Sequence, residues 1–156
     1  MRGPIVTSSF LPASPQTVWD RIATIEGIND EFAGLFRMTA PRDVREAGLG
    51  GVTVGERICR SWILLFGVIP FDYDDITLVS LDPPHGFHER SPMLSNRMWE
   101  HKRTIVEADG GCVLTDEISY EPRVPIVPHA ISGRVYAAVF GLRHRRLRKR
   151  FGGRPA

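Results

Sequence analysis

Residues 99–120, WEHKRTIVEADGGCVLTDEISY, have the pattern of two β-strands joined by a tight type I′ turn at Asp109-Gly110. With Ala108 facing Gly111, every charged cross-strand pair joins opposite signs, whereas a one-residue shift would mix apolar and polar faces. The sequence therefore predicts one register. Its main pairs are Arg103–Asp116, Lys102–Glu117, Val106–Val113 and Trp99–Tyr120.

Alternation along these strands sends one set of side chains towards the interior. The set comprises Trp99, His101, Arg103, Ile105, Leu114, Asp116, Ile118 and Tyr120. Charged groups are costly to bury unless they are paired. Two interpretations follow: Arg103 and Asp116 form a structural ion pair in a dry core, or they belong to the polar wall of a ligand pocket with His101. We expect the pocket.

The rest of the chain predicts an α+β fold. Strands are expected at 5–11, 56–66, 71–81, 86–91, 97–108 and 111–121. Two short helices are expected after the first strand. The first begins after Ser14 and ends at Gly27, and the second covers 28–36. The segment 45–55 is expected to be a glycine-rich loop. A long helix should fill about 128–150, with apolar stripes that include Ile131 and Val135, and Phe140 and Leu147.

Length and composition suggest a single domain over 1–156, because 42% hydrophobic residues suffice for a core. Two separated cysteines predict neither a disulfide framework nor a zinc site. The longest apolar run, 62–71, is too short for a membrane span, and the N-terminus lacks a signal-peptide pattern. We expect a cytoplasmic protein that is a monomer or a dimer.

Net charge is +2, and the basic residues gather in RHRRLRKR at 143–150. We expect these arginines to coat the outside of a helix, so nucleic acid is not an expected partner. His85, His88 and Glu89 offer metal-ligand atoms but no further convergent ligand, so no metal is expected.

Three segments resemble the START-like, or SRPBCC, superfamily: FLPASPQTVWDRIA (10–23), FGVIPFDYDDITLVSLDPPHGFHER (66–90) and MWEHKRTIVEADGGCVLTDEISYEP (98–122). The last is similar to a bacterial polyketide cyclase/dehydrase subgroup in the positions of Trp99, His101, Thr115-Asp116 and Tyr120. Arg103 stands where that subgroup often has a second histidine. The resemblance implies a helix-grip fold, in which a curved antiparallel β-sheet wraps around a long C-terminal α-helix over a hydrophobic cavity.

The expected function is binding of a small lipophilic ligand in this cavity, for carriage, sensing or sequestration, without a cofactor. The expected ligand-binding residues are Trp62, Tyr73, Trp99, His101, Arg103, Asp116, Ile118, Tyr120, Tyr136 and Phe140. The alternative is an aromatase/cyclase- or dehydratase-like enzyme acting on a polyketide-type substrate, with His101, Arg103 and Asp116 as its acid–base and anion-stabilising groups. A further alternative is an interaction module that uses the basic C-terminal helix.

Overall fold

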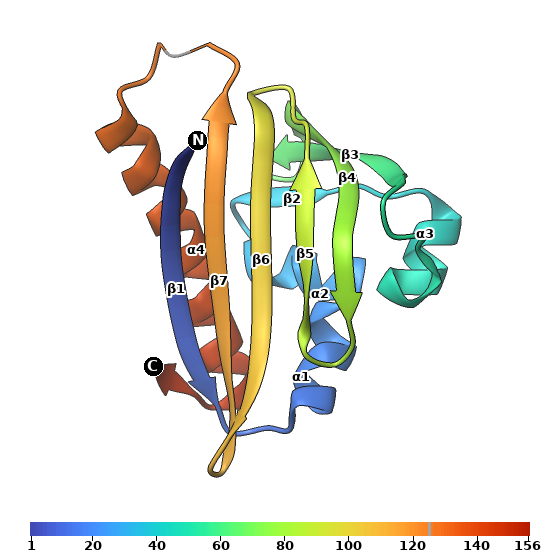
Figure 1. Ribbon diagram of the computed structural model, residues 1–156, viewed down its shortest axis with the longest axis vertical. Coiled ribbons are helices and arrows are strands. Elements are labelled where there is room, and N and C mark those ends of the chain that lie inside the picture. Colours follow the sequence, from blue (N-terminus) through green and yellow to red (C-terminus); the bar gives the residue numbers. More distant parts are fainter. Residues whose placement is uncertain (125) are drawn as a thin grey trace.

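A computed structural model describes residues 1–124 and 126–156 and has a single long strand followed by short helices at its N-terminal end (Figure 1). The elements of this part are β1 (Arg2–Leu11), α1 (Pro15–Ile22), α2 (Ile25–Phe32), β2 (Phe36–Met38), α3 (Arg42–Ala47) and the 3-10 turn η1 (Gly48–Gly51). The remaining elements are β3 (Arg57–Leu65), β4 (Ile69–Asp82), β5 (Gly86–Ser91), β6 (Asn96–Ala108), β7 (Gly111–Pro122), α4 (His129–Phe151) and β8 (Arg154–Pro155).

The strands form one antiparallel sheet in the order β2-β3-β4-β5-β6-β7-β1-β8. The sheet curves, and α4, α1 and α2 lie on one side of it (Figure 1). This is the helix-grip architecture expected from the sequence. None of the helices in the described part of the chain has the length and apolar character needed to cross a membrane.

The register of β6 and β7 confirms the predicted pairing. Arg103 lies opposite Asp116, Val106 opposite Val113 and Trp99 opposite Tyr120. The expected type I′ turn is wrong, because that type needs a positive φ at both central residues and only Gly110 has one, at 77°. The pairing of Ala108 with Gly111 is nevertheless kept.

The junction between α1 and α2 differs from the expectation of one helix running to Gly27. The Thr24 hydroxyl accepts a hydrogen bond from the Gly27 amide at 3.0 Å, so Thr24 caps a new helix. A Cβ on Gly27 would lie 1.9 Å from the carbonyl oxygen of Arg21, so only glycine allows the two helices to meet this closely. The turn of α2 that follows carries Glu31 to a position only 2% exposed.

The segment expected to be a glycine-rich loop is partly helical, since α3 and η1 cover 42–51. Pro41 fixes the backbone before α3, and Asp43 lies in its first turn, where a negative charge is favourable. The helix forms despite the glycines because these come only after its last residue, Ala47.

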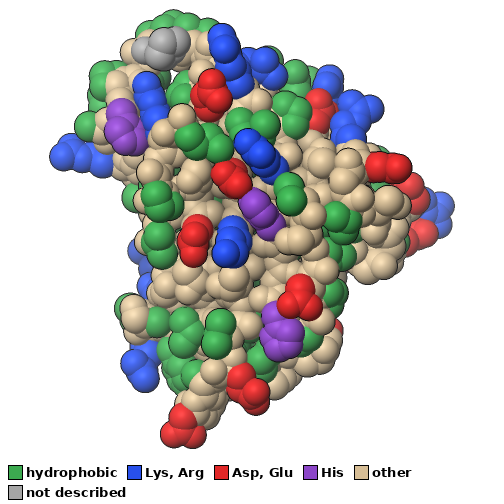
Figure 2. Space-filling view, in the orientation of Figure 1, with side chains coloured by type: hydrophobic (Ala, Val, Ile, Leu, Met, Phe, Trp, Pro, Cys, Tyr) green, Lys and Arg blue, Asp and Glu red, His purple; other side chains and the backbone are tan. Residues whose placement is uncertain are grey.

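The helix α4 contacts the sheet through the stripe that contains Tyr136, Phe140 and Leu147. Phe140 and Leu147 are each 2% exposed and belong to two neighbouring apolar clusters of the core. The other expected stripe is wrong at its beginning, because Ile131 and Val135 are more than half exposed. The outer face of the sheet carries charges of both signs, including the Lys102–Glu117 pair, without a large field of one sign (Figure 2).

Candidate functional site

A cavity of about 490 Å³ lies between the sheet and helices α2 and α4. This volume is within the range of roughly 300–1,000 Å³ that is usual for small-molecule sites. Most of the wall is apolar. Prominent members of this apolar wall are Ile28, Phe32, Phe36, Ile63, Ile76 and Val139.

The residues expected to bind a ligand fall into three groups. Those that line the cavity are Trp99, His101, Arg103, Tyr120, Tyr136 and Phe140. Asp116 and Ile118 have no exposed surface and lie behind the wall. Contact between either of these two side chains and a ligand is therefore not supported.

The placement of Trp62 and Tyr73 in the cavity is wrong. The two residues lie opposite each other in β3 and β4, and their rings meet edge to face at 5.6 Å between centroids. Trp62 is 42% exposed, and the guanidinium of Arg60 covers the Tyr73 ring at 4.0 Å. Because alternate residues face opposite sides of a strand, the inward positions of β4 belong to Asp72 and Asp74 instead.

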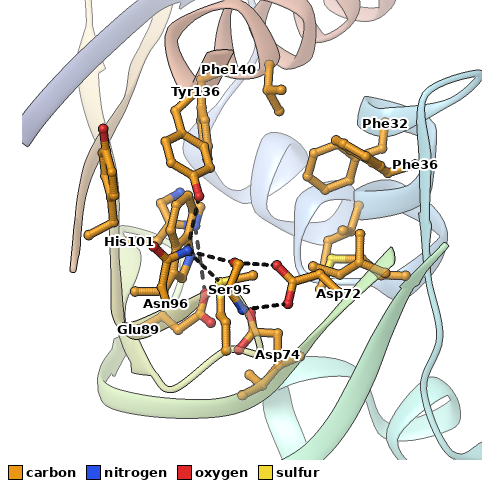
Figure 3. Close-up of a pocket in the computed structure, with 18 of the residues that line it drawn as sticks. Phe32, Phe36, Asp72, Asp74, Glu89, Ser95, Asn96, His101, Tyr136 and Phe140 are labelled. Carbon is orange, nitrogen blue, oxygen red and sulfur yellow. Dashed lines mark hydrogen bonds and ion pairs between the residues drawn. The ribbon is translucent and has the colours of Figure 1, made fainter. Parts of the chain in front are cut away.

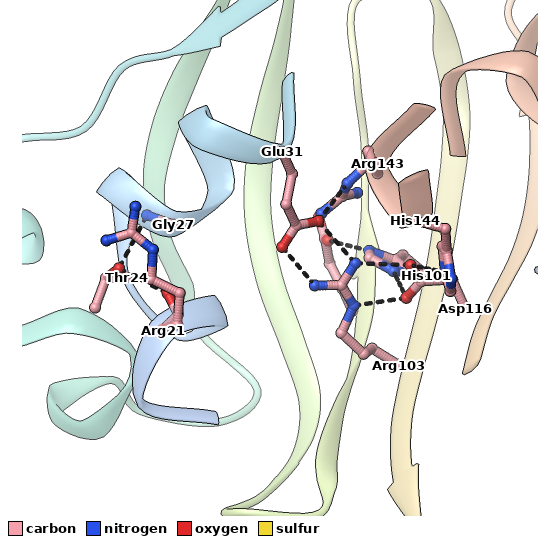
Figure 4. A network of polar contacts seen from close by, with 10 residues as sticks. Arg21, Thr24, Gly27, Glu31, His101, Arg103, Asp116, Arg143 and His144 are labelled. Atoms are coloured by element: carbon pink, nitrogen blue, oxygen red, sulfur yellow. Dashed lines mark hydrogen bonds and ion pairs between the residues drawn. The ribbon is translucent and has the colours of Figure 1, made fainter. Parts of the chain in front are cut away.

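Arg103 lies at the centre of a cluster that we call the buried ion network. Its members are Glu31, His101, Arg103, Asp116, Arg143 and His144 (Figure 4). The Arg103 guanidinium donates from Nε and Nη2 to the two carboxylate oxygens of Asp116, each at 2.7 Å. It also donates from Nη1 and Nη2 to the two oxygens of Glu31, each at 2.9 Å. This double bidentate arrangement uses most of its donor capacity.

The other members complete the pairing. Arg143 donates from Nε to Glu31 at 2.8 Å, and its guanidinium covers the Phe32 ring at 4.5 Å. His101 and His144 each donate from Nε2 to Asp116, at 2.8 and 3.1 Å. Two guanidinium groups thus balance two carboxylates, which is the condition under which buried charges are tolerated.

Two further contacts extend the network to β1. The Ser9 hydroxyl donates to Nδ1 of His144 at 2.8 Å and accepts from the Arg148 guanidinium at 2.9 Å. Arg143 and His144 belong to the basic segment 143–150, so the expectation that its arginines only coat the outside of a helix is wrong for Arg143.

The pKa values of the buried groups follow from this pairing. Burial alone would raise the pKa of Asp116, but Arg103 and His101 outweigh it and hold the pKa well below its ordinary value. Burial likewise opposes ionisation of Glu31, and the pKa is lowered by Arg103 and Arg143. Burial lowers the pKa of His101 despite the neighbouring Asp116, so its imidazole favours the neutral form.

A second polar group, which we call the acidic end of the cavity, consists of Asp72, Asp74 and Glu89 (Figure 3). Asp72 is well paired, because it accepts from the Tyr73 amide at 2.8 Å and from both the amide and the hydroxyl of Ser95. Asn96 continues this chain by donating to the Tyr136 hydroxyl at 3.0 Å.

Asp74 and Glu89 are less completely paired. Glu89 accepts from the Ser91 hydroxyl at 2.8 Å, and its Oε2 lies 3.9 Å from Nδ1 of His101. Oδ1 of Asp74 is buried and has no hydrogen-bond partner within the described residues. Burial, followed by the negative charge of Glu89, raises the pKa of Asp74 well above its ordinary value.

Sequence reasoning missed the acidic end, although a signal was present. Asp72 and Asp74 share strand parity with the cavity residues Ile76 and Leu78, which places carboxyls on an otherwise apolar face. It also missed Glu31 and Arg143. Each lies three or four residues from apolar residues of its own helical segment, and this spacing places it on the same face as they are. The possible metal ligands do not converge, since His88 pairs with Glu100 while Glu89 lines the cavity.

Comparisons with known proteins identify a family for this chain and solved structures with a similar fold. Residues 9–151 match the family model described as a domain of unknown function, DUF8410. No curated protein is significantly similar in sequence. Solved structures that resemble the chain include protein CV1439 from Chromobacterium violaceum, with a TM-score of 0.69 and 12% identity over 94% of this chain and 95% of that one.

Two further structures are informative about the fold. A START superfamily protein from Mycobacterium smegmatis has a TM-score of 0.66 and 10% identity, covering 95% of this chain and 96% of its own. DynU16, from the dynemicin biosynthetic locus, has a TM-score of 0.58 and 18% identity, and it is matched over 92% of this chain but 46% of its own. The chain belongs to the DUF8410 family, and its fold is that of the START-like, SRPBCC proteins.

Proposed function

We propose that residues 1–156 form one ligand-binding unit that holds a small lipophilic molecule between the sheet and α4. The observation that carries this proposal is the cavity of about 490 Å³, whose wall is mostly apolar. An apolar wall favours an apolar guest, because binding removes hydrophobic surface from water. Carriage, sensing or sequestration would each use such a site.

The test is a fluorescence titration with N-phenyl-1-naphthylamine, a neutral apolar probe. Saturable binding is expected, and an Ile76→Trp variant should abolish it because the indole would occupy the cavity. Val79→Trp is the matched control, since Val79 is on the same strand and 47% exposed. Equal probe binding by both variants, or no saturable binding by the wild type, would contradict the proposal.

A second candidate is acid–base catalysis of the aromatase/cyclase or dehydratase kind. One observation favours it: His101 lines the cavity while Asp116 accepts from its Nε2, an arrangement that orients an imidazole for proton transfer. Arg103 supports this candidate less, because its donors are engaged by two carboxylates. Turnover of a polyketide-type substrate that is lost in His101→Gln would establish it, whereas saturable binding without product would argue against it.

The interaction module based on the basic helix is not supported to the same degree. Arg143, His144 and Leu147 of that segment are buried, and Arg148 is hydrogen-bonded to Ser9. These residues attach the helix to the sheet.

A further inference from the structure

The charges in the cavity wall do not balance. Arg103 and Arg143 reach the wall, but their charge is matched by Glu31 and Asp116 within the buried ion network. Arg2 also lies in the wall, and it donates to the Val127 carbonyl oxygen and the Ser132 hydroxyl, near the start of α4.

The acidic end has no such compensation. Within the described residues, no lysine or arginine forms an ion pair with Asp72, Asp74 or Glu89, and the imidazole beside Glu89 favours its neutral form. The negative charge that these acidic groups share attracts positive charge more strongly in a largely apolar enclosure than it would in water.

Asp74 provides an observation that is independent of the charge count. Its side chain is 4% exposed, it lies in the cavity wall, and its Oδ1 has no hydrogen-bond donor in the part of the chain that the structure describes. The one proton of the neighbouring Ser91 hydroxyl is donated to Glu89 instead. A buried acceptor without a donor is destabilising, so a ligand that supplies the donor gains affinity at this position.

Resting on the proposed function, we infer that the preferred ligand is a lipophilic amine whose ammonium group binds between Asp74 and Glu89. An ammonium group brings a positive charge and three N–H donors, which suits an unpaired acceptor beside a second carboxyl. Its apolar body would lie along the wall near Phe32, Phe36 and Phe140, which faces the acidic end across the cavity (Figure 3). A fatty acid would instead bring a second negative charge to the carboxyls.

The experiment compares three ligands that share one alkyl chain: dodecylamine, dodecan-1-ol and dodecanoate. Each displaces N-phenyl-1-naphthylamine from the wild type at concentrations below its own aggregation. Dodecylamine is expected to bind about tenfold or more tightly than dodecan-1-ol, the usual gain for a hydrogen bond between charged partners. Dodecanoate is expected to bind least tightly.

The Asp74→Asn variant should lose most of the amine preference while dodecan-1-ol binding stays within about twofold, because only the head group is affected. Asp82→Asn is the matched control, since Asp82 lies on the same strand and is exposed. Thermal melting checks the fold, and Asp74→Asn should melt no lower than the wild type because it removes a buried carboxyl whose Oδ1 has no donor among the described residues.

The outcomes separate the two proposals. If dodecan-1-ol displaces the probe but the amine is not preferred, or if the preference survives in Asp74→Asn, the inference is overturned and the proposed function stands. If dodecanoate binds most tightly, the inference is overturned as well. If neither the probe nor any of the three ligands binds, both proposals fail together.

Discussion

The buried ion network and the acidic end of the cavity meet at His101, which contacts Asp116 through one ring nitrogen and approaches Glu89 with the other. In the network, each carboxylate oxygen accepts from at least one guanidinium or imidazole. At the acidic end, a buried oxygen of Asp74 accepts no hydrogen bond from any residue that the structure describes. Both groups are almost fully buried, so burial alone does not distinguish them. They differ in the pairing of their carboxyl oxygens.

The largest loss of stability is expected when one charge is removed from the buried ion network. Asp116→Asn removes the charge that balances Arg103 and should lower the free energy of unfolding by about 3–5 kcal/mol. Urea denaturation measures this loss. The control is Glu117→Gln, one residue along on the outer face, where a loss of about 1 kcal/mol or less is expected. A similar small loss in Asp116→Asn would mean that water reaches the network.

Removing both central partners should cost much less than removing one. In the double variant Arg103→Met with Asp116→Leu, Glu31 and Arg143 remain as one balanced pair. The free energy of unfolding should return to within about 2 kcal/mol of the wild type, the remainder reflecting the acceptor lost by the two imidazoles. A double variant as unstable as Asp116→Asn would show that the charge balance is not what stabilises the region.

A substitution at the acidic end of the cavity should raise the stability of the protein, whereas one in the buried ion network lowers it. Asp74→Asn replaces a carboxyl whose Oδ1 has no donor among the described residues, and it should raise the free energy of unfolding by up to about 1 kcal/mol at neutral pH. Asp82→Asn should change it by less than about 0.5 kcal/mol. A clear loss of stability in Asp74→Asn, measured in the same urea titrations, would place Asp74 with the structural charges.

The smallest expected effect is the pH dependence of the stability that Asp74→Asn gains over the wild type. Because the pKa of Asp74 is raised in the folded protein, the folded carboxyl keeps its proton while the unfolded one ionises above about pH 3.9. The wild type thus loses stability as pH rises from this value, and asparagine does not. The gain in Asp74→Asn should therefore shrink as pH falls from 7 to 4.

Asp116 provides the contrast for this measurement. Its pKa is lowered in the folded protein, so the stability it contributes is present above about pH 3.9 and is lost only as pH falls further. The deficit of Asp116→Asn should stay constant between pH 7 and 5 and shrink at more acidic pH. Equal pH dependence of the two variants would contradict the distinction between the groups.

Much of the β6–β7 hairpin could be predicted because its information is local. The turn at Asp109-Gly110 and the opposite charges of Arg103 and Asp116 specify one register, and that register orients His101. Trp62 could not be placed in this way, because both faces of its strand carry apolar residues and the sequence does not state which face is inward.

The contacts of Glu31 and Arg143 with the buried ion network could not be predicted for a different reason. Glu31 lies 72 residues before Arg103 and 112 before Arg143, and no pattern within one element indicates that the three side chains meet. Their meeting depends on how α2 and α4 pack against the sheet. The sequence placed Arg103 and Asp116 on the correct face, and Arg103 lines the expected cavity, but Asp116 lies behind its wall.

The position of Arg143 in the C-terminal half of α4 has a consequence for synthesis of the chain. Glu31, Arg103 and Asp116 are all translated earlier, and without Arg143 they carry two negative charges against one positive. A nascent chain that stops before Arg143 would have to bury a net charge in order to close its sheet, which is strongly unfavourable. We therefore expect closure of the sheet to await the emergence of Arg143 from the ribosome, so that chains ending before this residue remain open to proteolysis.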